Sequence, residues 1–97
     1  MTNHWNDYQN TDVFMVLGTN PAENHPISMR WIDRARETRG AKLIVVDPKF
    51  NRTAAKADLY VPIRPGTDIA FLGGLMNYAM TNGRYFHEYV AMYTNAS

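Results

Sequence analysis

The feature that most constrains the fold is a run of four branched apolar residues, Leu43-Ile44-Val45-Val46, that ends at Asp47-Pro48. No polar residue alternates with the apolar ones, so both faces of this segment must be buried. That pattern is typical of a central strand in a parallel sheet. The sequence therefore predicts a buried strand within residues 41–48.

The remaining elements are predicted from shorter apolar runs, helical spacing and end signals. They are strands over residues 12–18 and 59–63, a helical turn over 52–57, and helices over about 27–39, 69–81 and 85–92. Pro26 and Gly40 delimit the first long helix. Pro62 indicates an edge position or a strand end.

Two apolar faces are predicted on the long helices. The expected buried positions are Ile27, Trp31 and Ala35 on the first, with Met29 and Ile32 beside them, then Ile69, Leu72, Met76 and Ala79 on the second. Strands that alternate with helices predict right-handed crossovers and a parallel sheet with helices packed on it. Three strands make a small sheet, so we expect a piece of a larger α/β domain.

Composition excludes several kinds of partner and site. The chain has ten Lys+Arg and nine Asp+Glu, so its net charge is close to zero. This charge balance gives no electrostatic reason to expect nucleic acid or an anionic membrane as the main partner. The 97 residues hold no cysteine, which excludes thiolate ligands, cysteine-ligated clusters and thiol nucleophiles among them. The three histidines show no metal-ligand spacing. We predict no metal site, no catalytic residue and no direct membrane contact.

Polar loops follow the three predicted strands, at the end where open parallel sheets bind ligands. Asp47 can accept hydrogen bonds from ribose hydroxyls, Asp68 can accept from the N–H groups of a guanine edge, and Lys49 can contact phosphate. Gly18 and Gly66 allow the backbone to approach a ligand closely. These residue types favour a nucleotide-like ligand.

Each of these residues also has a purely structural interpretation, which the sequence leaves open. Gly18 can simply turn the chain, Asp47-Pro48 can end a strand, and Asp68 can cap a helix. His25, beside a proline at a helix start, is expected to cap or pack. Neither a G-x-G-x-x-G nor a P-loop motif is present, so an ordinary dinucleotide fold and a P-loop enzyme are not indicated.

Several stretches form a recognisable pattern in order and spacing. Residues 16–26 read VLGTNPAENHP, residues 40–49 read GAKLIVVDPK, and residues 62–70 read PIRPGTDIA, with Ala57-Asp58 before the last. This pattern resembles the molybdopterin oxidoreductases, and most closely the catalytic (alpha) subunit of formate dehydrogenases. The resemblance covers essentially the whole chain.

The resemblance implies that residues 1–97 are a single segment of the molybdopterin-binding α/β domain of a larger catalytic subunit. The implied fold is Rossmann-like and three-layered, a short parallel sheet flanked by helices. The implied activity is the two-electron oxidation of formate to carbon dioxide. We expect a molybdopterin guanine dinucleotide as cofactor, with molybdenum or tungsten and a 4Fe-4S cluster in the parent subunit only. The isolated chain is expected to be inactive.

The resemblance also implies partners and site residues. The partners are the remainder of the catalytic subunit and an iron–sulfur electron-transfer subunit, in the periplasm or alternatively the cytoplasm. Eight residues match cofactor-binding positions: Asn20, Glu23, Val46, Asp47, Lys49, Gly66, Thr67 and Asp68. Gly18 joins them through its backbone. Asp47 is expected to face ribose and residues 66–68 to recognise guanine. Lys49 stands where arginine is common, so it keeps the charge but loses the bidentate fork.

The metal-ligating selenocysteine or cysteine of the family is absent from these residues. We expect it to precede Met1, which would then be an internal methionine of a longer reading frame. A selenocysteine codon read as a stop would separate this chain from the part of the longer reading frame that precedes it. Two other hypotheses stay open: a stand-alone nucleotide-binding or structural module without redox chemistry, and a fragment whose apolar faces drive self-association.

Overall fold

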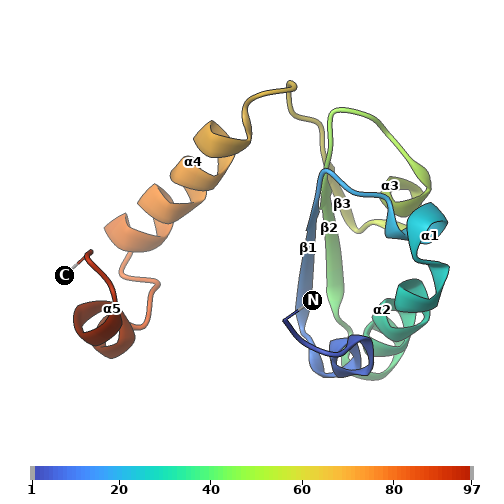
Figure 1. Ribbon diagram of the computed structural model, residues 1–97, viewed down its shortest axis with the longest axis horizontal. Helices are drawn as coiled ribbons and strands as arrows, with labels where there is room; N and C mark the ends of the chain where they lie inside the picture. The colour runs from blue at the N-terminus through green and yellow to red at the C-terminus, as the bar shows by residue number, and fades with distance from the viewer. Residues whose placement is uncertain (1, 97) are drawn as a thin grey trace. The chain divides into compact units, whose positions relative to one another are not determined.

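The computed structural model describes residues 2–96, which form two compact units, Met1–Arg64 and Pro65–Ser97 (Figure 1). Met1, to which the expectation of an internal start refers, lies outside the described residues. The first unit contains the sheet and the second contains two helices, α4 (Asp68–Thr81) and α5 (His87–Tyr93).

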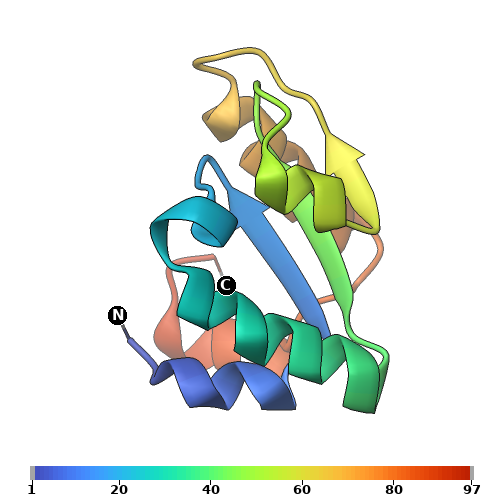
Figure 2. The same ribbon diagram turned by 90° about the vertical axis from the view of Figure 1, so that its right-hand side faces the viewer.

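The first unit alternates strands with helices. In chain order its elements are the 3₁₀ helix η1 (Trp5–Asn10), β1 (Val13–Leu17), α1 (Pro21–Asn24), α2 (Pro26–Arg39), β2 (Lys42–Val46), α3 (Arg52–Lys56) and β3 (Leu59–Val61). All three strands are parallel, in the order β1-β2-β3. The helices α1, α2 and α3 lie on one side of the sheet (Figures 1 and 2). The predicted α/β fold with a short parallel sheet is confirmed.

The buried centre of the first unit is β2. Leu43, Val45 and Val46 are 0% exposed, as the uninterrupted apolar run predicted, whereas Ile44 is half-buried. The register pairs Leu43 with Phe14 on one side and Val45 with Tyr60 on the other. Burying each of these branched side chains stabilises the folded state by about 1.5–3 kcal/mol, which favours the position of β2 between its neighbours.

Helix α2 begins and ends as predicted and buries most of the predicted face. Pro26 occupies its first turn, and Gly40 ends it in the left-handed conformation at φ 66°. The buried positions are Ser28, Met29, Ile32 and Ala35. The predicted face was therefore correct at Met29, Ile32 and Ala35. Trp31 is half-buried, and the prediction was wrong for Ile27, which is exposed.

The second unit does not bury the predicted stripe of α4. No residue of this helix is buried, and Ile69 and Met76 are 87% and 62% exposed. A unit of two helices offers little apolar surface of its own against which a mainly apolar helix can pack. Within residues 2–96, no helix has the length and apolar character needed to cross a membrane.

Asp58 joins β2 to the start of β3 through both its backbone and its side chain. Its N–H donates to the Leu43 carbonyl at 2.8 Å, and its carboxylate Oδ2 accepts from the Leu43 N–H at 2.8 Å. Arg36 lies 3.3 Å from Oδ1. The hydrogen bond from Leu43, assisted by the Arg36 charge, lowers the pKa of Asp58 below its usual value.

We expect Asp58→Asn to weaken the decrease of the free energy of unfolding that accompanies a fall in pH in the acidic range. A carboxyl whose pKa is lower in the folded state stabilises the fold above its unfolded pKa, and this contribution is lost as pH falls through the folded pKa. Urea unfolding followed at several pH values measures it. Asp33→Asn, which breaks only an exposed ion pair with Lys56 (3.0 Å), is the control. Identical pH profiles for wild type and Asp58→Asn would contradict the assignment.

Candidate functional site

The loops that follow β1 and β2 meet at the carboxyl end of the sheet. Leu17 and Val46 are paired at the ends of the two strands, and the Gly18 N–H donates to the Val46 carbonyl at 3.0 Å. Gly18 has φ 60°, and no atom lies within 4 Å of the position a Cβ would take. The glycine thus turns the chain, which confirms its structural interpretation, and it leaves open space beside its backbone.

A buried hydroxyl ties the first loop to α3. The Thr53 side chain is 0% exposed, donates to Asn20 Oδ1 at 2.7 Å and accepts from the Ala22 N–H at 3.0 Å. Sequence reasoning missed Thr53. The signal that could have revealed it is a hydroxyl followed by two alanines in a helical turn directly after a candidate loop.

The predicted residues Asn20 and Glu23 are connected to each other. Asn20 Nδ2 donates to Glu23 Oε2 at 2.8 Å, and Glu23 Oε1 lies 3.2 Å from Arg52. A side-chain amide has two N–H groups and two acceptor lone pairs. The hydrogen bonds of Asn20 to Glu23 and Thr53 therefore use about half of its hydrogen-bonding capacity. One donor and one acceptor position remain for a ligand.

The loop after β2 is held by Tyr60. Its hydroxyl donates to the Asp47 carbonyl oxygen at 2.9 Å, and its ring meets Phe50 edge to face at 5.1 Å between centroids. Asn51 caps α3 by accepting from the Ala54 N–H at 2.9 Å. This loop therefore has a defined conformation.

The predicted residues of that loop play unequal parts. Asp47 Oδ1 accepts from the Lys49 N–H at 2.8 Å, which is the turn expected of a strand exit. No hydrogen bond to Asp47 Oδ2 from another of residues 2–96 is found, so this oxygen has capacity to accept a further one. The Lys49 side chain is exposed, whereas that of Val46 is fully buried and supports the loop from below.

The third predicted group belongs to the second unit. Gly66 has φ 82°, Thr67 is the N-cap residue of α4, and Asp68 is the first residue of the helix. Asp68 therefore does not cap α4. Its carboxylate lies at the helix N-terminus, where the helix dipole favours negative charge.

The structure also shows the surroundings of His25 and of the other His, Asp and Glu side chains. His25 meets Trp5 edge to face at 5.5 Å between ring centroids, which confirms its predicted packing role. Among residues 2–96, no group of three or more His, Asp or Glu side chains could hold a metal ion. The first unit instead brings amide, carboxylate and cationic side chains to one sheet edge: Asn20, Glu23, Asp47, Lys49 and Arg52. This donor set suits hydroxyl and phosphate groups.

We expect Thr53→Val to destabilise the fold by about 1–3 kcal/mol, because it leaves the Ala22 N–H and the buried oxygen of Asn20 without a partner. Thr53→Ser keeps the hydroxyl and is the matched control. We expect it to lower the stability by about 0.8 kcal/mol, because it removes one buried methyl group. Urea unfolding measures both. Equal stability of Thr53→Val and wild type would show that the network contributes nothing.

Comparisons with known proteins agree with the sequence motifs. The molybdopterin oxidoreductase family model matches residues 1–86. Over all 97 residues, the chain is 56% identical to formate dehydrogenase 2 subunit alpha (cytochrome c-553) of Nitratidesulfovibrio vulgaris and 55% identical to the formate dehydrogenase-O major subunit of Escherichia coli. A nitrate reductase of Shewanella frigidimarina is 36% identical over 90 residues, 93% of this chain.

The chain spans only 10% of the length of each of these three relatives. The likeness nevertheless covers most or all of the chain, including both loops at the sheet edge and the turn before α4. The family predicted from the sequence motifs is therefore confirmed, and the chain belongs to the molybdopterin oxidoreductase family.

Proposed function

We propose that residues 1–97 are a single segment of the molybdopterin-binding α/β domain of a formate dehydrogenase catalytic subunit. There the segment binds a molybdopterin guanine dinucleotide. The relatives with 55% and 56% identity are formate dehydrogenase subunits, and the chain spans 10% of their length. The activity then belongs to a longer polypeptide, and the segment supplies part of the cofactor site.

The observation that carries this proposal is the pair of loops fixed at the carboxyl end of β1 and β2. The Gly18–Val46 hydrogen bond and the buried Thr53 hydroxyl hold both loops on the sheet. Preorganised loops bind without a further cost of ordering. The open polar atoms they present, above all Asp47 Oδ2, match a ligand with ribose hydroxyls and phosphates.

Each predicted residue then has a definite role. Asp47 Oδ2 accepts from ribose hydroxyls, and the remaining donor and acceptor of Asn20 contact the ligand. Glu23 orients Asn20, and Val46 acts by supporting the loop. The exposed ammonium group of Lys49 contacts phosphate.

The backbone at Gly18 allows close approach, and the turn of Gly66, Thr67 and Asp68 binds the guanine edge. When bound, the cofactor supplies molybdenum or tungsten for the two-electron oxidation of formate to carbon dioxide. Residues 1–97 position the cofactor and provide no catalytic side chain.

The remaining parts of the enzyme follow from the same proposal. The rest of the catalytic subunit carries the 4Fe-4S cluster, and an iron–sulfur electron-transfer subunit accepts the electrons. Formate is the substrate of the whole enzyme. The proposed location is the periplasm.

We expect the native polypeptide that carries this sequence to have about ten times the 11.1 kDa mass of the chain, because the chain is 10% of its relatives' length. Intact mass, together with molybdenum and tungsten analysis of the same sample, measures this. A free polypeptide of 11.1 kDa without metal would contradict the proposal. It would favour a stand-alone module or an inert fragment.

We expect Asp68→Asn in the full-length enzyme to weaken cofactor binding about ten- to hundredfold, since a carboxylate that accepts from both guanine N–H groups is worth roughly 1.5–3 kcal/mol. Among residues 2–96, no hydrogen bond or ion pair is found for the Asp68 side chain, so the fold should survive. Released guanine nucleotide and metal per polypeptide are the readouts. Asp33→Asn is the control, because it removes the same negative charge at a position outside the proposed site. Unchanged cofactor content in Asp68→Asn would remove Asp68 from the site.

A further inference from the structure

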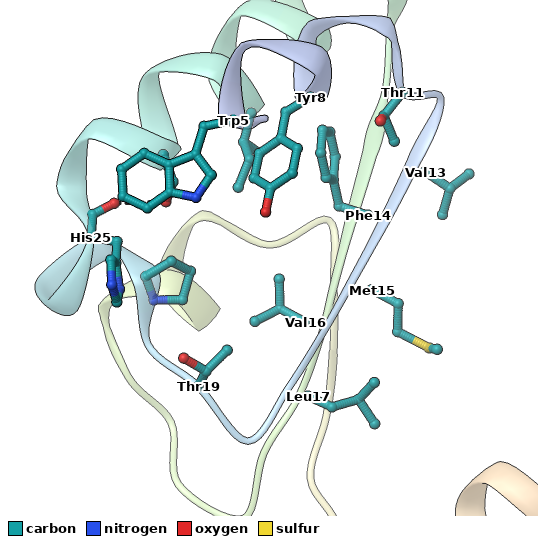
Figure 3. A pocket seen from close by; sticks show the side chains of 13 residues that line it. Trp5, Tyr8, Thr11, Val13, Phe14, Met15, Val16, Leu17, Thr19 and His25 are labelled. Carbon is teal, nitrogen blue, oxygen red and sulfur yellow. Dashed lines mark hydrogen bonds between the residues drawn. The ribbon is translucent and has the colours of Figure 1, made fainter. Parts of the chain in front are cut away.

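One aromatic side chain of the first unit differs from the others in its exposure. Beside β1, the rings of Tyr8 and Phe14 meet edge to face at 5.8 Å between centroids. Figure 3 shows both rings near Trp5, around the hollow that they line, and all three residues are buried or half-buried. Phe50, in the loop after β2, is 60% exposed. Among residues 2–64, it is the one exposed Phe, Tyr or Trp.

Hydrogen bonds fix the backbone on both sides of Phe50. Before it, Asp47 Oδ1 accepts from the Lys49 N–H at 2.8 Å, and the Asp47 carbonyl oxygen accepts from the Tyr60 hydroxyl at 2.9 Å. After it, the Asn51 side chain caps α3. Phe50 therefore extends from a defined point of the loop at the carboxyl end of β2.

The Phe50 ring is held by the Tyr60 ring and still has an open face. The two centroids are 5.1 Å apart, and the ring planes are at 89° to each other. An edge-to-face contact covers at most one face of each ring, so the other face of Phe50 stays available to a planar partner. Because contact with Tyr60 already restricts the ring, binding such a partner costs little further side-chain freedom.

The same loop carries groups that the proposed function assigns to a nucleotide. Asp47 Oδ2 is assigned to the ribose hydroxyls and Lys49 to phosphate. The base of a nucleotide is bonded directly to its ribose, so a ribose held at Asp47 brings its base to this loop. Aromatic side chains bind bases by stacking on their faces, and every base has such a face. Phe50, one residue after Lys49, is the aromatic side chain placed to do so.

We propose that the open face of Phe50 stacks on the guanine base of the molybdopterin guanine dinucleotide. The proposed function assigns the edge of that base to residues 66–68, and hydrogen bonds at an edge leave the faces of a base uncovered. Phe50 then adds affinity that does not depend on which base is present, while residues 66–68 select guanine. This inference rests on the proposed function and adds a binding residue to it.

The rate of cofactor loss from the purified full-length enzyme tests this role, measured as the guanine nucleotide that the protein retains over time. Phe50→Leu keeps an apolar side chain but removes the stacking face, so we expect loss to be about fivefold faster or more. Phe50→Trp keeps such a face and is expected to match wild type. Phe86→Leu is the control, the same change at a phenylalanine that is 70% exposed in the second unit. Equal rates for Phe50→Leu and wild type, or equally fast loss from Phe50→Trp and Phe50→Leu, would overturn the proposal.

Photo-crosslinking from a photoreactive aromatic residue at position 50 of the same enzyme identifies what lies against the ring. A peptide that contains position 50 and carries the added mass of a guanine nucleotide supports the proposal. A crosslink to another peptide of the enzyme overturns it. Absence of guanine nucleotide from the wild-type enzyme would remove the proposed function together with this inference. Guanine nucleotide that is present in wild type and retained equally by Phe50→Leu would remove this inference alone.

Discussion

The burial of Leu43 and Val45 in β2 is the constraint on which the rest of the first unit depends. Both are 0% exposed, with β1 and β3 paired to either side of β2 and with Met29, Ile32 and Ala35 of α2 in the same core. Once these conditions are met, the ends of β1 and β2 lie side by side and the loops that follow them must leave the sheet together. The position of the candidate site is thus a consequence of apolar burial.

Apolar burial brings the loops together, and polar satisfaction gives them a defined shape. A buried hydroxyl or amide without a partner costs about 1–3 kcal/mol, so Thr53, Asn20 and the Ala22 N–H constrain one another. In the loop after β2, Asp47 Oδ1 accepts from the Lys49 N–H, and no hydrogen bond to Asp47 Oδ2 is found among residues 2–96. The two oxygens of this one carboxylate therefore differ, because one contributes to the turn and the other is the atom that the proposed function assigns to the ligand.

The sequence pattern predicted what depends on neighbouring residues. The buried residues Leu43, Val45 and Val46 of β2, the Pro26 start and the Gly40 end of α2 follow from local signals, and all were confirmed. Thr53 was missed and the burial of Ile27 was wrongly predicted, because hydrogen bonds and packing between distant segments decide both. For Gly66, Thr67 and Asp68 the sequence predicted the turn and helix start, while their binding role stays a prediction.

The failed prediction for α4 and the exposed apolar residues of β1 have one physical origin. A pattern states which side chains would be buried if a partner surface existed, and it does not state whether the same 97 residues supply that surface. Ile69 at 87% exposed and Met15 at 43% exposed are apolar positions whose burial needs more chain than each unit contains. The chain spans 10% of the length of its formate dehydrogenase relatives. Incomplete burial within each unit therefore supports the proposal that the sequence belongs to a longer polypeptide.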